Sequence, residues 1–177
     1  MNKKLIYYVS ILATMVLAVT SCACSHDEAG ESNIPGNSET RPSEFANDDE
    51  LLDYIQKVHL NYMWEGAEET SGLACERIHL DGNYPENDKD VVTIGGSGFG
   101  LAGLIVGIDR GFISREDGVK RLNKIVDYLA KADRFHGVWP HWLDGPTGKV
   151  KPFGQKDNGG DLVESCFLME SLLCARQ

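Results

Sequence analysis

Apolar side chains recur every three or four residues in four segments of the chain, which is the spacing that places them on one face of an α-helix. No segment shows the alternation of apolar and polar residues that is typical of a strand. The pattern therefore predicts an all-α fold with about four helices. These helices cover residues 48–63, 97–108, 114–129 and 159–177, and an extended loop covers residues 134–156.

Polar residues mark the starts of these helices. Asn47 or Asp48 can cap the first helix, and Ser114 with Asp117 resembles a capping box that has Asp in place of the usual Glu. The fourth helix begins near Gly159 and is apolar on most sides, so it needs more neighbours than three helices supply. The chain also ends inside this helix. We therefore expect the chain to be a fragment of a larger helical domain.

A glycine motif lies in the segment VVTIGGSGFGLAGLIVG, residues 91–107, where Gly98, Gly100 and Gly103 spell G-x-G-x-x-G. In a dinucleotide-binding turn, this motif is followed by a helix and then by a second strand that ends in an acidic residue. Here a helix, a short turn at 109–113 and another helix follow instead. We therefore expect these glycines to form a smooth helix face for close packing, and not to bind NAD or ATP.

The first residues have the features of a secretory leader. Lys3 and Lys4 precede the apolar run 5–19, and the sequence Val-Thr-Ser-Cys that ends at Cys22 resembles a bacterial lipobox. The alternative is a membrane anchor helix, but the run is shorter than the roughly 20 residues that span a bilayer. We predict a lipoprotein signal peptide at 1–21. Cys22 would then be lipidated and the protein exported to the outer membrane, facing either the cell surface or the periplasm.

Composition divides the remaining chain and excludes one class of partner. Residues 22–46 are rich in Ser, Glu, Gly, Asn and Pro and are predicted to be a disordered tether, with a globular domain at 47–177. Removing residues 1–21 removes two lysines and no acid, so the formal charge of −10 becomes −12. Nucleic acid is therefore not an expected partner. The cysteines lack zinc spacing, and Cys166 and Cys174 are expected to be buried.

Three carboxylates near the start of the fourth predicted helix are the strongest candidates for chemistry. Asp157, Asp161 and Glu164 have spacings of four and three residues, so on a helix they would share one face within about 100° of arc. Gathering like charges on an apolar element is one way in which enzymes tune acids and bases for proton transfer. The alternative is that Asp157 caps the helix and Asp161 complements its dipole. Glu164 lies in the second turn, where the dipole effect has faded.

Aromatic residues precede these acids in the sequence. Trp139, His141 and Trp142 lie in the loop before the fourth helix, and Phe153 follows them. Indole rings stack on the apolar faces of pyranose rings while acids bind their hydroxyl groups, so the combination predicts a sugar site. The alternative is that these tryptophans fill the core.

A second polar cluster lies in the long connection between the first two helices. Trp64, Glu65, Arg77 and Asp90 are candidates to line the site, and the alternative is that they are ordinary surface residues. The acids within 81–90 do not match the calcium-binding loop of an EF-hand, so no metal or other cofactor is predicted.

Several segments together resemble a known family. The sequences YMWEGA, SGLACER, FHGVWPHWLDGPTGK and DNGGDLVE, in this order within 48–177, resemble the bacterial glucoamylase-like domain, which includes the β-1,2-glucanases of glycoside hydrolase family 144. The resemblance implies the N-terminal portion of an (α/α)6 barrel, no metal in the chemistry, and hydrolysis of β-1,2-glucan with inversion of the anomeric centre.

The resemblance also implies roles for individual residues. The family's acidic cluster falls on Asp157, Asp161 and Glu164, and its general acid is a glutamate on a later helix, which we expect beyond residue 177. We expect Asp161 to act as the base, with the other two acids orienting it or binding hydroxyl groups. The side chains expected to hold sugar rings are Trp64, Glu65, Trp139, His141 and Trp142.

Three other functions stay open at this point. The chain could be a carbohydrate-binding surface lipoprotein without hydrolytic activity, which would need the same aromatic residues but would tolerate loss of the acids. It could also be related to transglycosylases, because similar domains occur in cyclic β-1,2-glucan synthases, although the lipoprotein leader argues against that membrane context. The third alternative is a helical fragment with no activity.

Overall fold

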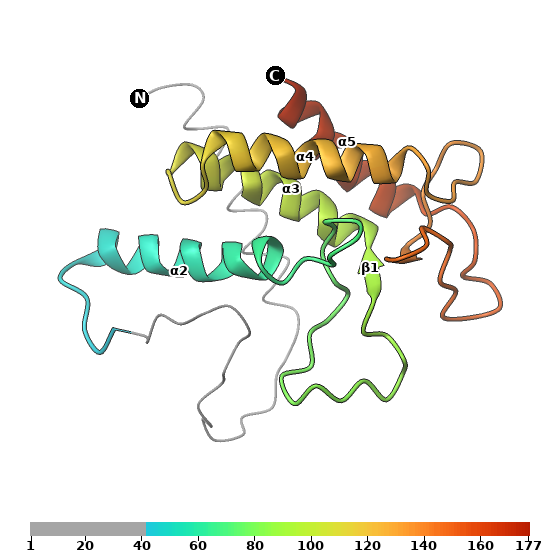
Figure 1. The fold of residues 1–177 in the computed structure, drawn as a ribbon, viewed down its shortest axis with the longest axis horizontal. Helices are drawn as coiled ribbons and strands as arrows, with labels where there is room; N and C mark the ends of the chain where they lie inside the picture. The colour runs from blue at the N-terminus through green and yellow to red at the C-terminus, as the bar shows by residue number, and fades with distance from the viewer. Residues whose placement is uncertain (1–41) are drawn as a thin grey trace. The chain divides into compact units, whose positions relative to one another are not determined.

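The computed structural model describes residues 42–177 (Figure 1). The predicted signal peptide, Cys22 and most of the predicted tether lie outside these residues and stay predictions. Residues 42–177 contain four helices: α2 (Asp48–Trp64), α3 (Ile94–Asp109), α4 (Arg115–Leu129) and α5 (Leu162–Arg176). The mainly helical fold is therefore confirmed. The structure adds a feature that the sequence pattern did not predict, a small sheet of β1 (Val91–Thr93) and β2 (Trp142–Asp144).

Two of the predicted helix caps are present in the structure. The Asn47 side chain accepts a hydrogen bond from the Glu50 N–H at 2.9 Å, which satisfies a free amide at the start of α2. Ser114 accepts from the Asp117 N–H at 3.0 Å, and its hydroxyl donates to the Asp117 carboxylate at 2.6 Å. The shorter Asp side chain therefore points to the cap hydroxyl, where Glu in a standard capping box would bond to the cap N–H.

Helix α3 begins three residues earlier than predicted, at Ile94, because β1 leads directly into it and Thr93 takes the N-cap position. The strand pairs with β2 in an antiparallel arrangement in which Val92 lies opposite Leu143. No parallel sheet follows the glycines anywhere in residues 42–177. The prediction that the glycine motif does not belong to a dinucleotide-binding fold is confirmed for this part of the chain.

Helix α3 is the central element and contacts α2, α4, α5 and β1. Figure 1 shows it between α2 and α4. Its glycines allow close approach on two sides. Gly107 lies against Leu60 of α2, and Gly98 lies against the backbone of Phe167 and Leu168 in α5. The prediction that the glycines provide a smooth face for helix packing is therefore confirmed.

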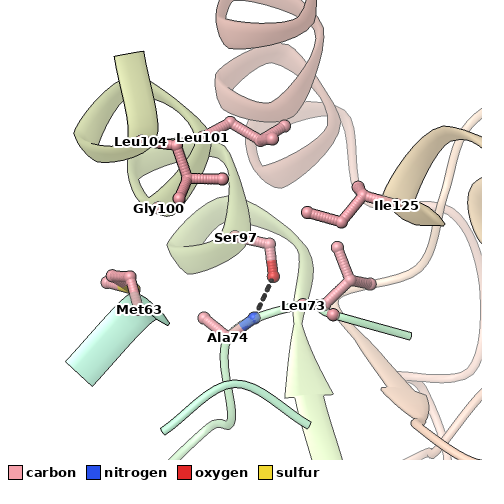
Figure 2. A pocket seen from close by; sticks show the side chains of 9 residues that line it. Met63, Leu73, Ala74, Ser97, Gly100, Leu101, Leu104 and Ile125 are labelled. Carbon is pink, nitrogen blue, oxygen red and sulfur yellow. Dashed lines mark hydrogen bonds between the residues drawn. The ribbon is translucent and has the colours of Figure 1, made fainter. Parts of the chain in front are cut away.

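The core forms where α3 meets the other helices and the small sheet. It contains one small pocket, lined mainly by apolar side chains and by Ser97, whose hydroxyl accepts a hydrogen bond from the Ala74 N–H at 3.0 Å (Figure 2). The pocket volume of about 10 Å³ can hold at most a single water molecule, so it is far too small for a sugar or a nucleotide. The most deeply buried apolar side chains are Leu73, Val91, Val92, Ile94, Leu101, Leu143 and Leu168.

Helix α5 buries one narrow face against α3 through Ser165, Leu168 and Ser171. Its other faces carry exposed apolar side chains, among them Leu162 with 70% of its surface exposed. Cys166 lies outside the buried face and is exposed, so the prediction of its burial is wrong, and Cys174 is only half-buried. Within residues 42–177 no helix has the length and apolar character needed to cross a membrane.

Candidate active site

The N-terminus of α5 places the first carboxylate of the site. Asp161 is the N-cap of this helix, and its Oδ1 atom accepts hydrogen bonds from the N–H groups of Val163 at 2.9 Å and Glu164 at 3.1 Å. The other carboxylate oxygen, Oδ2, takes no part in the cap. An aspartate therefore caps this helix, as the capping alternative proposed, but the capping residue is Asp161 and not Asp157.

The prediction that Asp157, Asp161 and Glu164 share one helix face is wrong for Asp157. The helix begins at Leu162 instead of near Gly159, because Gly160 pairs with Pro140 in a β-bridge that keeps this segment extended. Asp157 lies in an exposed turn, where its N–H donates to the Gly154 carbonyl at 3.1 Å. Its role in the site stays a prediction.

The second oxygen of Asp161 faces the imidazole of His141. The His141 Nδ1 atom lies 3.2 Å from Asp161 Oδ2, and its Nε2 atom lies 3.8 Å from Glu164 Oε2. About a third of the His141 side chain is exposed, whereas Glu164 is more deeply buried, with 17% of its side chain exposed. The imidazole therefore lies between two carboxylates, and the partly exposed surface of these three side chains is the open face of the site.

Helix α3 binds the side chain of Glu164, whose backbone N–H is already bound to Asp161. The Gly95 N–H, in the first turn of α3, donates to Glu164 Oε2 at 2.7 Å. The N-terminus of a helix favours a negative charge because its first amides lack partners within the helix. Any side chain at position 95 would collide with this carboxylate, so the contact requires glycine. Since Gly95 faces Glu164 and Gly98 faces Phe167, the two helices run in the same direction and bring both N-termini to the site.

The loop that carries His141 is tied to both of these N-termini. The His141 carbonyl accepts from the Ile94 N–H at 3.0 Å, at the start of α3. The Trp139 N–H donates to Ser165 Oγ at 3.0 Å, and the Trp139 carbonyl accepts from the Asp161 N–H at 2.8 Å, at the start of α5. These bonds fix the imidazole relative to both carboxylates.

Of the tryptophans predicted to hold sugar rings, Trp142 lies at this face. Its ring stacks on His141, with 3.7 Å between centroids and 16° between planes, and Phe153 lies against it at 4.4 Å. Its indole N–H donates to Glu76 Oε2 at 2.9 Å. The three rings therefore form one aromatic cluster beside the two carboxylates, and Trp142 is half-buried within it.

Trp139 and Trp64 pack in or against the core. Trp139 is only 9% exposed, and its indole N–H donates to the Leu129 carbonyl at 3.3 Å. Trp64 packs against the core beneath the Arg121 guanidinium, which lies 4.5 Å from the ring centroid. Core filling, the alternative for the tryptophans of this loop, is therefore the role that the structure shows for Trp139, whereas Trp64 is a half-buried residue packed against the core.

Three further residues were predicted to line the site, namely Glu65, Asp90 and Arg77. Glu65 is the exposed C-cap of α2, and Asp90 is exposed, with its carbonyl bound to the Gly145 N–H at 2.8 Å. Arg77 is linked to the site through Glu76, whose carboxylate lies 3.6 Å from the guanidinium.

Cys75 directly precedes Glu76, and its thiol is not suited to act as a nucleophile in the site. Burial raises the pKa of its thiol to about 11, and the negative charges of Glu68 and Asp90 act in the same direction. The thiolate is the nucleophilic form of cysteine, so this side chain is unreactive near neutral pH. Within residues 42–177, no three His, Cys, Asp or Glu side chains are grouped so that they could hold a metal ion.

Two residues of the site were not predicted from the sequence, Glu76 and Gly95. Glu76 lies in the sequence SGLACER beside Arg77, but its contact with Trp142 spans 66 residues and depends on the tertiary fold. Gly95 carries a local signal, because paired glycines at the start of a helix are unfavourable unless a close contact requires them. That signal indicates a contact but not its partner.

Comparison with known proteins relates the chain to bacterial glucanases. It is 52% identical over 131 residues to the exo β-1,2-glucooligosaccharide sophorohydrolase (non-reducing end) of Parabacteroides distasonis, a match that covers 73% of this chain and 17% of that protein. No family model matches the chain.

Solved structures give the same relation. The endo-β-1,2-glucanase of Chitinophaga pinensis, in complex with sophorotriose and glucose, is 62% identical with a TM-score of 0.73, over 75% of this chain and 32% of that one. A β-1,2-glucanase of Parabacteroides distasonis is 50% identical with a TM-score of 0.67, over 73% of this chain and 18% of that one. The chain therefore spans at most about a third of the length of these relatives, and its four helices form part of the same helical fold.

Proposed function

We propose, from the premise that this chain is homologous to part of the bacterial β-1,2-glucanases, that the open face around His141 binds β-1,2-linked glucan and takes part in its hydrolysis. The observation that carries the proposal is the placement of Asp161 and Glu164 on either side of His141, next to the ring of Trp142. The acids and the aromatic residues all lie within residues 141–164, and Gly95 at the start of α3 supplies the contact from a distant segment.

The chemistry assigned to Asp161 is that of a base. In hydrolysis with inversion, a carboxylate takes a proton from the attacking water while a carboxylic acid protonates the leaving oxygen, at roughly 6.5–9.5 Å from the base. Asp161 suits the first role because two backbone amides fix Oδ1, so that Oδ2 keeps one orientation toward the open face. We assign no general acid within residues 42–177.

Glu164 and Trp142 are assigned to substrate binding. The Gly95 N–H holds one oxygen of Glu164, so its carboxylate presents a fixed acceptor for sugar hydroxyl groups. The ring of Trp142 offers an apolar surface that is continuous with Phe153. Asp157 lies in an exposed turn of the adjacent loop, and we retain it as a candidate for hydroxyl binding.

The proposal predicts the linkage and the stereochemistry of the reaction. The full-length gene product should hydrolyse β-1,2-glucan and leave β-1,3-glucan and α-1,4-linked maltooligosaccharides intact. Proton NMR at early times should show the new reducing end as the α-anomer, because inversion converts a β-linkage to an α-configured product. Cleavage of maltooligosaccharides alone would overturn the proposal. Binding of β-1,2-glucan without any cleavage would favour the carbohydrate-binding alternative.

A further inference from the structure

A chain of polar contacts runs from the interior to the ring of Trp142, and the proposed chemistry does not use it. It starts at Asp88, whose side chain is completely buried in the connection between α2 and β1. The Arg77 Nε atom lies 3.1 Å from Asp88 Oδ2, and His79 Nε2 lies 3.9 Å from Oδ1. A buried carboxylate is costly unless a cation compensates it. Arg77 supplies that positive charge as an ion pair, although neither Asp88 oxygen accepts a hydrogen bond among the described residues.

Arg77 in turn faces the carboxylate of Glu76. The guanidinium lies 3.6 Å from Glu76 Oε1, while Glu76 Oε2 accepts the indole N–H of Trp142 at 2.9 Å. The backbone of Glu76 is fixed as well, because its N–H donates to the Val91 carbonyl at 2.8 Å, at the start of β1. The Glu76 side chain is mostly shielded, with 22% exposed. Its two oxygens are therefore divided between the Arg77 guanidinium and the indole of Trp142.

The orientation of Trp142 controls the surface that a sugar would meet. Its ring lies nearly parallel to the imidazole of His141, with 16° between the two planes, and it also contacts the ring of Phe153. Stacking alone permits an aromatic ring to slide and rotate in its plane, whereas a hydrogen bond from the indole N–H fixes the direction of one edge. Glu76 supplies that bond.

We infer that Glu76 is a positioning residue that fixes the ring of Trp142 in register with His141, and that Arg77 and Asp88 hold the Glu76 carboxylate for this purpose. The consequence for substrate rests on the proposed function: Glu76 would set affinity for β-1,2-glucan without touching the reacting atoms. The contact itself is independent of any substrate.

The first test measures the contact without a substrate. In ¹⁵N-labelled full-length gene product, the indole N–H signal of Trp142 is identified by its loss in Trp142→Phe. Glu76→Ala should speed hydrogen exchange of this indole N–H by about tenfold or more, the scale of losing a bond to a charged acceptor. Glu76→Gln keeps an acceptor oxygen and should retain most of the protection. Equal exchange rates in wild type and Glu76→Ala would overturn the inference.

The second test measures the effect on substrate. Glu76→Ala should raise KM for β-1,2-glucan by about tenfold and change kcat by less than about threefold, because it removes binding shared by the ground state and the transition state. Glu76→Gln should restore most of the affinity. Glu86→Ala, at an exposed carboxylate in the same connection, is the matched control and should leave KM unchanged.

A double-mutant cycle separates positioning from general loss of structure. In a Trp142→Phe background, which keeps an aromatic ring but lacks the indole N–H, Glu76→Ala should cause no further rise in KM. Independent, additive effects of the two substitutions would contradict the inference. If the wild type cleaves no β-1,2-glucan, the proposed function fails, and the indole exchange rates still decide whether Glu76 positions Trp142.

Discussion

Asp161→Asn is expected to lower the turnover of β-1,2-glucan by the full-length gene product by about 10² or more, the scale of losing an acid or base catalyst. The substitution removes the negative charge that faces His141 at 3.2 Å. It leaves the helix cap intact, because the side-chain oxygen of Asn can still accept from the N–H groups of Val163 and Glu164. Activity should therefore fall while the folded structure survives.

Asp161→Ala is the matched control for the capping role. It removes both the charge and the cap, so it should lower the free energy of unfolding by about 1 kcal/mol, whereas the Asn variant should stay close to the wild type. Initial rates and thermal unfolding of the three proteins give the comparison. Wild-type hydrolysis by the Asn variant would mean that Asp161 is only a cap. A loss of stability equal to that of the Ala variant would contradict the expectation that Asn preserves the cap.

Gly98→Ala is expected to lower the free energy of unfolding by about 1–3 kcal/mol, the usual cost of forcing an added group into a packed interface. A Cβ atom at this position would lie 2.6 Å from the Phe167 carbonyl carbon and 2.7 Å from the Leu168 nitrogen. These are backbone atoms of α5, so they can move only if the two helices separate. The gain in helix propensity of up to about 1 kcal/mol does not offset this clash.

Gly103 provides the control in the same helix. A Cβ atom there would meet Leu60 Cδ1 at 3.9 Å, an ordinary contact. Gly103→Ala should therefore raise stability by up to about 1 kcal/mol, so the two substitutions have opposite signs. Urea unfolding followed by circular dichroism measures both variants. If Gly98→Ala is as stable as Gly103→Ala, the close packing of α3 on α5 is not required.

Helices α2 and α4 could be predicted closely because their signals are local. A cap residue, a polar first turn and apolar residues at helical spacing all lie within one segment of the sequence. The start of α5 could not be predicted in this way, because the spacing of Asp157 and Asp161 is compatible with a helix. The bridge between Gly160 and Pro140 decides the boundary, and it joins residues that are 20 positions apart.

The sequence pattern placed Asp161 and Glu164 together at the start of α5, but it misplaced Asp157, missed Glu76 and did not separate the roles of the two tryptophans. Trp139 and Trp142 lie three residues apart in one motif, and the local sequence does not show which ring is buried. The outcome depends on the Leu129 carbonyl, which binds the indole of Trp139, and on Glu76, which binds that of Trp142. Both partners come from other segments, so only the tertiary fold separates the two roles.

A crystal structure of the full-length gene product with sophorotriose would show whether the face around Asp161, His141, Trp142 and Glu164 is a β-1,2-glucan site. We expect a glucose ring against Trp142 and sugar hydroxyl groups within hydrogen-bonding distance of Asp161 or Glu164. Sophorotriose bound elsewhere on the protein, with this face unoccupied at saturating ligand, would contradict it.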